Sequence, residues 1–257
     1  MFSSFSLILS SNTGTTLPTN LSLASFAYLL ITSLSLYNLC SFSSLVKELL
    51  GIPGLKSLRI SSIEESEIDE ELISIIKDKG NFAKHLHIPL QSGSNHILKL
   101  MNRKYSREQF IAKIKKIKAL NPNIMISGDV IVGFPQEKEE DFMDSYKLCE
   151  ECFDMLHVFP YSLRPGTAAA RMDGQISPEV KKQRSKALLD LSDKLYAKFV
   201  ERFIGQDVTV LIEKYDSQKG VNIGHTSNYI SVEIPLKESK VGQYITIKLQ
   251  KSMTESK

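Results

Sequence analysis

The sequence predicts an α/β fold followed by a small antiparallel β-barrel. Between about residues 47 and 203, short apolar runs alternate with amphipathic stretches. Such alternation of strands and helices is typical of a parallel sheet with right-handed crossovers. After Gly205, apolar residues recur at every second position, glycines punctuate them, and no helical pattern is left. With 24% charged and 42% hydrophobic residues, most of the chain has the composition of a globular protein rather than a disordered one.

The first two strand–helix units are predicted from apolar runs and from helix-start signals. We expect a strand at residues 55–62 and a helix at residues 68–77, with acidic side chains in the first turn, where the helix dipole favours them. The second unit is a strand at residues 85–90 and a helix at residues 106–120. Ser106 begins that helix with a capping-box pattern, because Gln stands three residues later.

Two further units follow in the same style. The third is a strand at residues 124–132, ended by a Gly-Phe-Pro turn, and a helix at residues 138–152 with an acidic start. The fourth is a strand at residues 155–161 and a long helix at residues 178–203. Pro178 suits the first position of that helix, since its missing N–H would be unpaired there anyway.

The C-terminal part reads as about five short strands between residues 205 and 250. The predicted organisation is therefore an uncharged segment, an α/β domain, a β-domain and a short tail, at residues 1–46, 47–203, 204–251 and 252–257.

The first 46 residues differ from the rest because they carry no Asp, Glu, Lys or Arg. All 32 basic and 29 acidic side chains lie from Lys47 onward, and the segment contains twelve Ser and eleven Leu. A signal peptide would need basic residues after Met1. Residues 21–46 are long enough to cross a membrane but hold many hydroxyl groups, so a single span is only one alternative. We expect the segment to be non-native coding sequence or disordered, and we do not expect a membrane location.

Polar or glycine-containing turns follow every predicted strand of the α/β domain. In parallel α/β proteins, ligands bind beyond the carboxyl ends of the strands. Hydroxyl, amide, aromatic and guanidinium groups at these ends would suit a nucleoside, and glycine would allow close backbone approach. The alternative is that these segments are ordinary turns with turn chemistry. The four turns are residues 61–64, 91–94, 133–135 and 161–164.

Several motifs, in this order, resemble the radical S-adenosylmethionine (SAM) tRNA methylthiotransferases. The motifs are HLHIPLQSGS, ILKLMNRKY, DVIVGFP and EEDF, at residues 85–94, 97–105, 129–135 and 139–142. Three more narrow the resemblance to the branch that modifies N6-threonylcarbamoyladenosine beside the anticodon: RISSIE, LHVFPYS and RPGTAAARM, at residues 59–64, 156–162 and 164–172. The segment GHTSNY at residues 224–229 is similar to the RNA-binding TRAM domain, with His225 where Tyr is usual. The resemblance runs from about Leu45 to about residue 250, so it covers a C-terminal part of such an enzyme.

The resemblance implies a three-part enzyme, of which this chain holds a truncated radical SAM partial (β/α) barrel and a TRAM-like domain. The first two barrel units and an N-terminal cluster domain have no counterpart. The strand at residues 55–62 would then have an unpaired edge unless residues 1–46 cover it. Intact relatives use SAM and two [4Fe–4S] clusters; reductive cleavage of SAM yields a 5′-deoxyadenosyl radical that abstracts hydrogen from adenine C2 for methylthiolation. The implied partners are SAM and the tRNA anticodon stem-loop, with no protein partner evident and a cytoplasmic location.

The same resemblance assigns cofactor-binding roles to residues at the strand ends. They are Ser61, Ser62, Gln91, Ser92, Asp129, Ile131, Gly133, Tyr161, Ser162 and Arg164. Candidate RNA-binding residues are Arg103 and Lys104, in a basic stretch at residues 99–118, and Tyr229 and Tyr244, which could stack on bases or equally belong to the barrel core. No residue is assigned as catalytic.

The cysteines do not match the chemistry that the resemblance implies. A radical SAM cluster needs three thiolates in CxxxCxxC spacing, and the chain has only Cys40, Cys149 and Cys152. Cys149 and Cys152 lie one turn apart on one face of a predicted helix, and we expect them to be ordinary buried cysteines. A zinc site would need two further ligands at suitable spacing, and none is evident. We therefore expect no metal site. The sequence predicts a tRNA-modifying enzyme by family but a catalytically incomplete chain; the alternative is a non-catalytic RNA-binding remnant.

Overall fold

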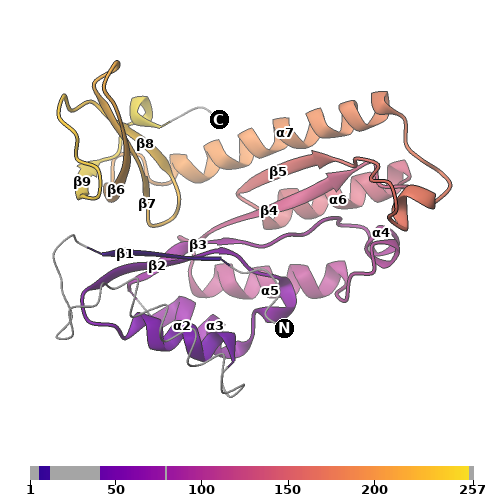
Figure 1. Ribbon diagram of the computed structural model, residues 1–257, viewed down its shortest axis with the longest axis horizontal. Coiled ribbons are helices and arrows are strands. Elements are labelled where there is room, and N and C mark those ends of the chain that lie inside the picture. The colour runs from indigo at the N-terminus through magenta and orange to yellow at the C-terminus, as the bar shows by residue number, and fades with distance from the viewer. Residues whose placement is uncertain (1–5, 12–40, 79, 255–257) are drawn as a thin grey trace. The chain divides into compact units, whose positions relative to one another are not determined.

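A computed structural model describes residues 6–11, 41–78 and 80–254 (Figure 1). The chain divides into two units. The described residues of the first unit fall within 1–63, 67–86 and 200–256, and the second unit comprises residues 64–66 and 87–199. The predicted α/β class and the separate antiparallel sheet are both confirmed.

The α/β part of the first unit is built on strands β2 (Leu55–Ser62) and β3 (Phe82–His87), which pair in parallel. Strand β1 (Ser6–Ser11) pairs with β2 in the antiparallel sense. Without a partner before residue 47, β2 would have one unpaired backbone edge. Strand β1, from the uncharged N-terminal segment, covers this edge.

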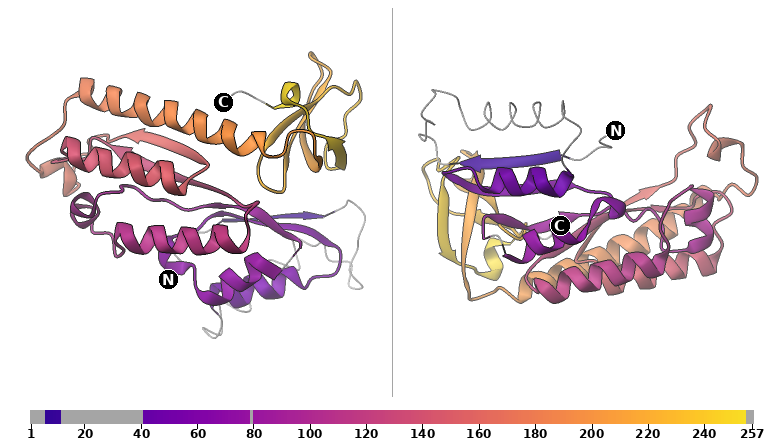
Figure 2. Two further views of the ribbon diagram at one scale, coloured as in Figure 1. Left: turned by 180° about the vertical axis from the view of Figure 1, so that it is seen from behind. Right: turned by 90° about the horizontal axis from the view of Figure 1, so that it is seen from below.

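Two amphipathic helices, α2 (Phe42–Leu50) and α3 (Glu70–Asp78), lie side by side in the same unit (Figure 2). The Ser43 hydroxyl donates to Asp69 Oδ1 at 2.5 Å, and the same oxygen accepts the N–H of Leu72 at 2.8 Å. Helix α2 begins before Lys47, inside the segment that we expected to be disordered, because Leu45 and Val46 are buried against the rest of the unit. Residues 12–40 lie outside the described part of the chain.

The C-terminal residues of the first unit form a four-stranded antiparallel sheet in the order β8-β7-β6-β9. Its strands are β6 (Asp207–Asp216), β7 (Val221–Thr226), β8 (Ser231–Ile234) and β9 (Tyr244–Lys248). The sheet has one strand fewer than expected, because residues 235–243 form a loop. The buried Asn222 side chain holds that loop by donating to the carbonyl oxygens of Leu236 and Glu238 at 3.1 and 3.0 Å.

The second unit contains β4 (Met125–Val132) and β5 (Met155–Pro160), which pair in parallel as predicted. Beyond the end of β3, the chain stays extended alongside β4, since the N–H groups of Ile88 and Leu90 donate to the carbonyls of Ser127 and Asp129 at 2.8 and 3.1 Å. The unit therefore presents three neighbouring strand ends at one edge, which is where the candidate site lies.

The helices of the second unit are α4 (Asn95–Leu100), α5 (Arg107–Leu120), α6 (Glu139–Cys152) and most of α7 (Pro178–Glu201). The capping box predicted at Ser106 is present in α5. Helix α5 buries Phe110 fully, with its ring 5.7 Å from that of Phe153. No helix within the described ranges is long and apolar enough to span a membrane, and most of the candidate span at residues 21–46 lies outside them.

Candidate nucleoside site

Polar side chains of the second unit meet around His87. Its Nδ1 lies 3.1 Å from the Ser127 hydroxyl, and its Nε2 lies 3.3 Å from Asp129 Oδ1. The ring of His157, from β5, is 5.4 Å from the ring of His87. One histidine thus contacts a hydroxyl and a carboxylate at once, which orients the Asp129 side chain. Asp129 was predicted as a cofactor-binding residue from the sequence, whereas neither histidine was.

The turn after this strand brings Gln91 and Ile131 together through the backbone. Gln91 has a positive φ of 65°; its N–H donates to the Asp129 carbonyl at 2.8 Å, and its own carbonyl accepts from Ile131 at 2.9 Å. Ser92 is fully buried, and its hydroxyl lies 3.3 Å from that of Ser145 in α6 while accepting the N–H of Ser94. The Ser92 hydroxyl therefore serves a contact within the fold.

The loop that follows β4 is closed by a buried carboxylate. Gly133, at a φ of 72°, donates its N–H to Glu137 Oε2 at 2.7 Å. The Arg184 guanidinium of α7 donates to the same oxygen at 2.6 Å, and also to the Glu137 carbonyl at 3.1 Å. Burial raises the pKa of Glu137, while the bonds from Gly133 and Arg184 oppose that rise. The loop geometry thus depends on a salt bridge with α7.

The end of β5 contacts the same loop through aromatic rings. The Tyr161 and Phe134 rings meet edge to face at 5.3 Å, and the Tyr161 N–H donates to Val132 at 2.8 Å. The Tyr161 hydroxyl is buried, and no described residue accepts or donates a hydrogen bond there. A buried hydroxyl without a partner is costly unless a ligand or water supplies one. Ser162 and Arg164, next along the chain, are exposed.

The structure gathers half of the predicted cofactor residues. Gln91, Asp129, Ile131, Gly133 and Tyr161 are linked by the contacts above within the second unit. Ser61 and Ser62 are half-buried at the end of β2 in the first unit. The Asp129 carboxylate and the Tyr161 hydroxyl, which has no partner among the described residues, fit the polar groups of an adenosine.

The predicted RNA-binding tyrosines line one cavity of about 320 Å³ in the first unit. The Tyr229 ring lies nearly parallel to those of His85 and His225, each at 4.4 Å, so the two histidines cover its opposite faces. Arg59 also lies 4.8 Å from the Tyr229 ring centre. Base stacking on Tyr229 would require one of these groups to move, whereas Tyr244 lines the cavity wall.

His225 has a second contact in this cavity. Its Nδ1 lies 2.7 Å from Glu213 Oε2, and this hydrogen bond lowers the pKa of the Glu213 carboxyl. Burial lowers the pKa of Arg59. His225 therefore has a carboxylate partner in Glu213.

Most of the basic side chains at residues 99–118 have carboxylate partners, which no local sequence pattern indicated. Arg103 lies 3.2 Å from Glu64. At least five of the eight basic residues in this stretch form ion pairs: Arg103, Arg107, Lys113, Lys115 and Lys118. Lys104 is exposed and contacts the Asn102 side chain at 3.5 Å. The stretch therefore offers less free positive charge to RNA phosphates than its composition suggests.

The described residues do not fit an iron–sulfur cluster. Cys149 and Cys152 are free and buried, and burial raises the pKa of both thiols, that of Cys152 to about 11. Cluster ligation needs thiolates, which such an environment disfavours. Within the described ranges, no group of three or more His, Cys, Asp or Glu side chains is arranged to hold a metal ion. Cys40 lies outside these ranges.

The chain is similar to known radical SAM proteins and to curated tRNA-modifying enzymes. Residues 41–149 match the radical SAM superfamily. The chain is 40% identical over 217 residues to the threonylcarbamoyladenosine tRNA methylthiotransferase MtaB of Bacillus subtilis, which covers 82% of this chain and 48% of that protein. It is 36% identical over 218 residues to a tRNA-2-methylthio-N(6)-dimethylallyladenosine synthase of Acetivibrio thermocellus, covering 84% of this chain and 45% of that protein.

Among solved structures, coproporphyrinogen III oxidase (HemN) of Escherichia coli, a radical SAM enzyme, aligns with a TM-score of 0.46 and 20% identity, over 86% of this chain and 52% of that chain. The chain spans about half the length of the curated relatives that it matches.

Proposed function

We propose, from the premise that most of the chain is similar to radical SAM tRNA methylthiotransferases, that it provides the nucleoside-binding and tRNA-binding parts of such an enzyme. The reaction proposed for the enzyme is methylthiolation at C2 of N6-threonylcarbamoyladenosine beside the anticodon, in the cytoplasm. The chain by itself is proposed to be catalytically incomplete, because its three cysteines lack the cluster spacing.

The observation that carries this proposal is the set of contacts at the ends of β4 and β5. Asp129, oriented by His87, is suited to accept hydrogen bonds from ribose hydroxyls. Gly133 gives the loop after β4 the positive φ that its turn needs, and the Tyr161 hydroxyl offers a donor and an acceptor that the described residues do not use. SAM would supply the adenosine that these groups bind.

We expect the chain to bind S-adenosylhomocysteine but not to cleave SAM. Asp129→Asn should weaken binding about tenfold or more, because a hydrogen bond to a charged group is lost. Isothermal titration calorimetry measures the affinity, and assay of 5′-deoxyadenosine after anaerobic reconstitution with iron and sulfide measures cleavage. Asp190→Asn, at an exposed position of α7, is the matched control. Equal affinity of the Asp129 variant would contradict the site, and cleavage would contradict the proposed incompleteness.

A second candidate function is RNA binding without catalysis, favoured by the cavity that Tyr244 shares with Arg59 and Lys56. Tyr244→Ala should raise the dissociation constant for tRNA about tenfold, since stacking on one base contributes roughly 1–3 kcal/mol. Fluorescence anisotropy with labelled tRNA at several salt concentrations measures this, and affinity should fall as salt rises.

The matched control is Tyr215→Ala, in β6 of the same sheet but outside the cavity. Equal losses in both variants would argue against base stacking at Tyr244. Binding of tRNA by a chain that does not bind S-adenosylhomocysteine would favour this second function over the first.

A further inference from the structure

We propose that α7 acts as a clasp, in which Lys181 and Arg184 are positioning residues for the loops at the ends of β4 and β5. The inference rests on the proposed nucleoside site, because these are the loops that would hold the adenosine. Neither cation is part of that site, and neither was singled out by the sequence. Both lie one helical turn apart, so a single rigid helix holds two loops.

Arg184 holds the loop after β4. Its Nη1 donates to Glu137 Oε2 at 2.6 Å, and this carboxylate oxygen also accepts the Gly133 N–H at 2.7 Å. Its Nη2 donates to Glu139 at 3.1 Å, at the start of α6. One guanidinium therefore connects α7 to both ends of the loop, through a buried contact to Glu137 and through an exposed carboxylate at Glu139.

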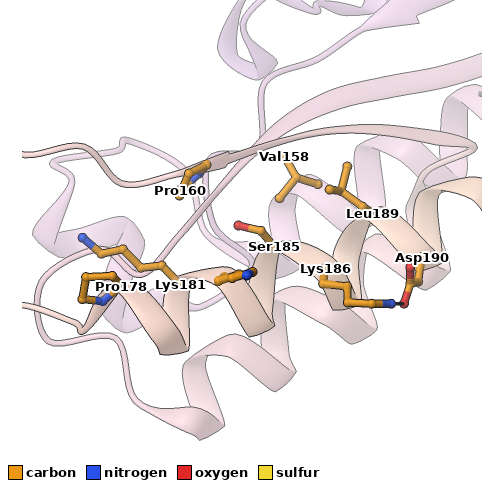
Figure 3. Close-up of a pocket in the computed structure, with 9 residues that line it drawn as sticks. Val158, Pro160, Pro178, Lys181, Ser185, Lys186, Leu189 and Asp190 are labelled. Carbon is orange, nitrogen blue, oxygen red and sulfur yellow. Dashed lines mark hydrogen bonds and ion pairs between the residues drawn. The ribbon is translucent and has the colours of Figure 1, made fainter.

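Lys181 holds the end of β5. Its ammonium donates to the Tyr161 carbonyl at 3.0 Å and lies 5.1 Å from the centre of the Tyr161 ring. Figure 3 shows Lys181 on the part of α7 beside Pro160, next to a largely apolar cavity of about 620 Å³. The stem of Lys181 also packs on Gly133, since a Cβ added there would lie 2.3 Å from Lys181 Cγ.

The loops after β4 and β5 also contact each other, because the Phe134 ring of the first packs against the Tyr161 ring of the second. A shift of α7 would therefore move both loops together. The helix dipole does not stabilise a cation near the start of a helix, so helix stability alone does not explain a lysine at 181 or an arginine at 184. The contacts that Lys181 and Arg184 make with the two loops do explain these residues.

Amide hydrogen exchange of the free full-length chain tests the clasp directly. Lys181→Met should speed exchange about tenfold around residues 155–163, and Lys181→Arg, which keeps the cation, should restore most of the protection. The double variant Glu137→Gln/Arg184→Gln avoids an unpaired buried charge, and it should speed exchange around residues 130–138 by a similar factor. Lys182→Met, an exposed neighbour on α7, is the control and should change neither segment.

S-adenosylhomocysteine affinity, measured on the same proteins, separates positioning from simple stabilisation. We expect a loss of several-fold in Lys181→Met and in the double variant, and none in Lys182→Met. Unchanged exchange in Lys181→Met would overturn the clasp, and faster exchange with unchanged affinity would overturn its positioning role. A parent chain that does not bind S-adenosylhomocysteine would instead contradict the proposed function, whatever the exchange pattern.

Discussion

Arg184→Met is expected to lower the free energy of unfolding by about 3–5 kcal/mol, because it leaves a buried carboxylate without its cation. Arg184 is 7% exposed and Glu137 is 2% exposed, so water cannot replace the lost contact. Urea unfolding followed by circular dichroism measures the change. Lys186→Met is the control: it removes an exposed ion pair to Asp190 on the same helix, and about 0.5 kcal/mol should be lost.

The loss in Arg184→Met should depend on pH in a defined direction. Burial raises the pKa of Glu137 above the ordinary value of a glutamate, and Arg184 opposes that rise, so removal of Arg184 should raise the pKa further. A carboxyl whose pKa is raised by folding contributes stability that is present below the unfolded pKa and lost as pH rises through the folded pKa. The variant should therefore be most impaired at neutral pH and recover towards the parent as pH falls through the raised folded pKa of Glu137, a recovery that is under way by about pH 5. An equal deficit at about pH 7 and about pH 5 would contradict this account.

Phe110→Ala is expected to cost a comparable amount, about 3–5 kcal/mol, by leaving a cavity under α5. The Phe110 side chain is fully buried, between the rings of Tyr105 at 6.0 Å and Phe153 at 5.7 Å. Chemical denaturation provides the measurement. Leu120→Ala, at a 38% exposed position of the same helix, should cost about 0.5 kcal/mol. A loss below about 1 kcal/mol in Phe110→Ala would show that the surrounding residues collapse into the space.

Elements with strong local signals were predicted closely. Strand β2 has the predicted bounds, and α5 has the predicted capping box at Ser106. Strand β3 begins at Phe82, before the predicted start, because Phe82 and Ala83 are buried despite the polar residues around them. Helix α4 was missed because it is only 6 residues long, too short for an apolar period to show.

Only part of the candidate site was predicted, because some of its contacts join residues that are far apart in the sequence. Residues at strand ends can be recognised one by one, and the motifs that carry the resemblance contain Asp129, Gly133 and Tyr161. The partners of these residues lie far away in the chain: Arg184 follows Glu137 by 47 positions. No local pattern marks such a pair, and none marks the carboxylates that neutralise the basic residues of α5.

The sequence by itself determined the fold class, the resemblance to radical SAM tRNA methylthiotransferases and the absence of cluster spacing among the three cysteines, because periodicity and motifs are properties of neighbouring residues. Tertiary structure alone decided that β1 covers the edge of β2, that histidines cover both faces of Tyr229, and that α7 holds the loops after β4 and β5. These outcomes depend on which segments the crossovers bring together, and on burial, which makes an unpaired charge or hydroxyl costly enough to select its partner.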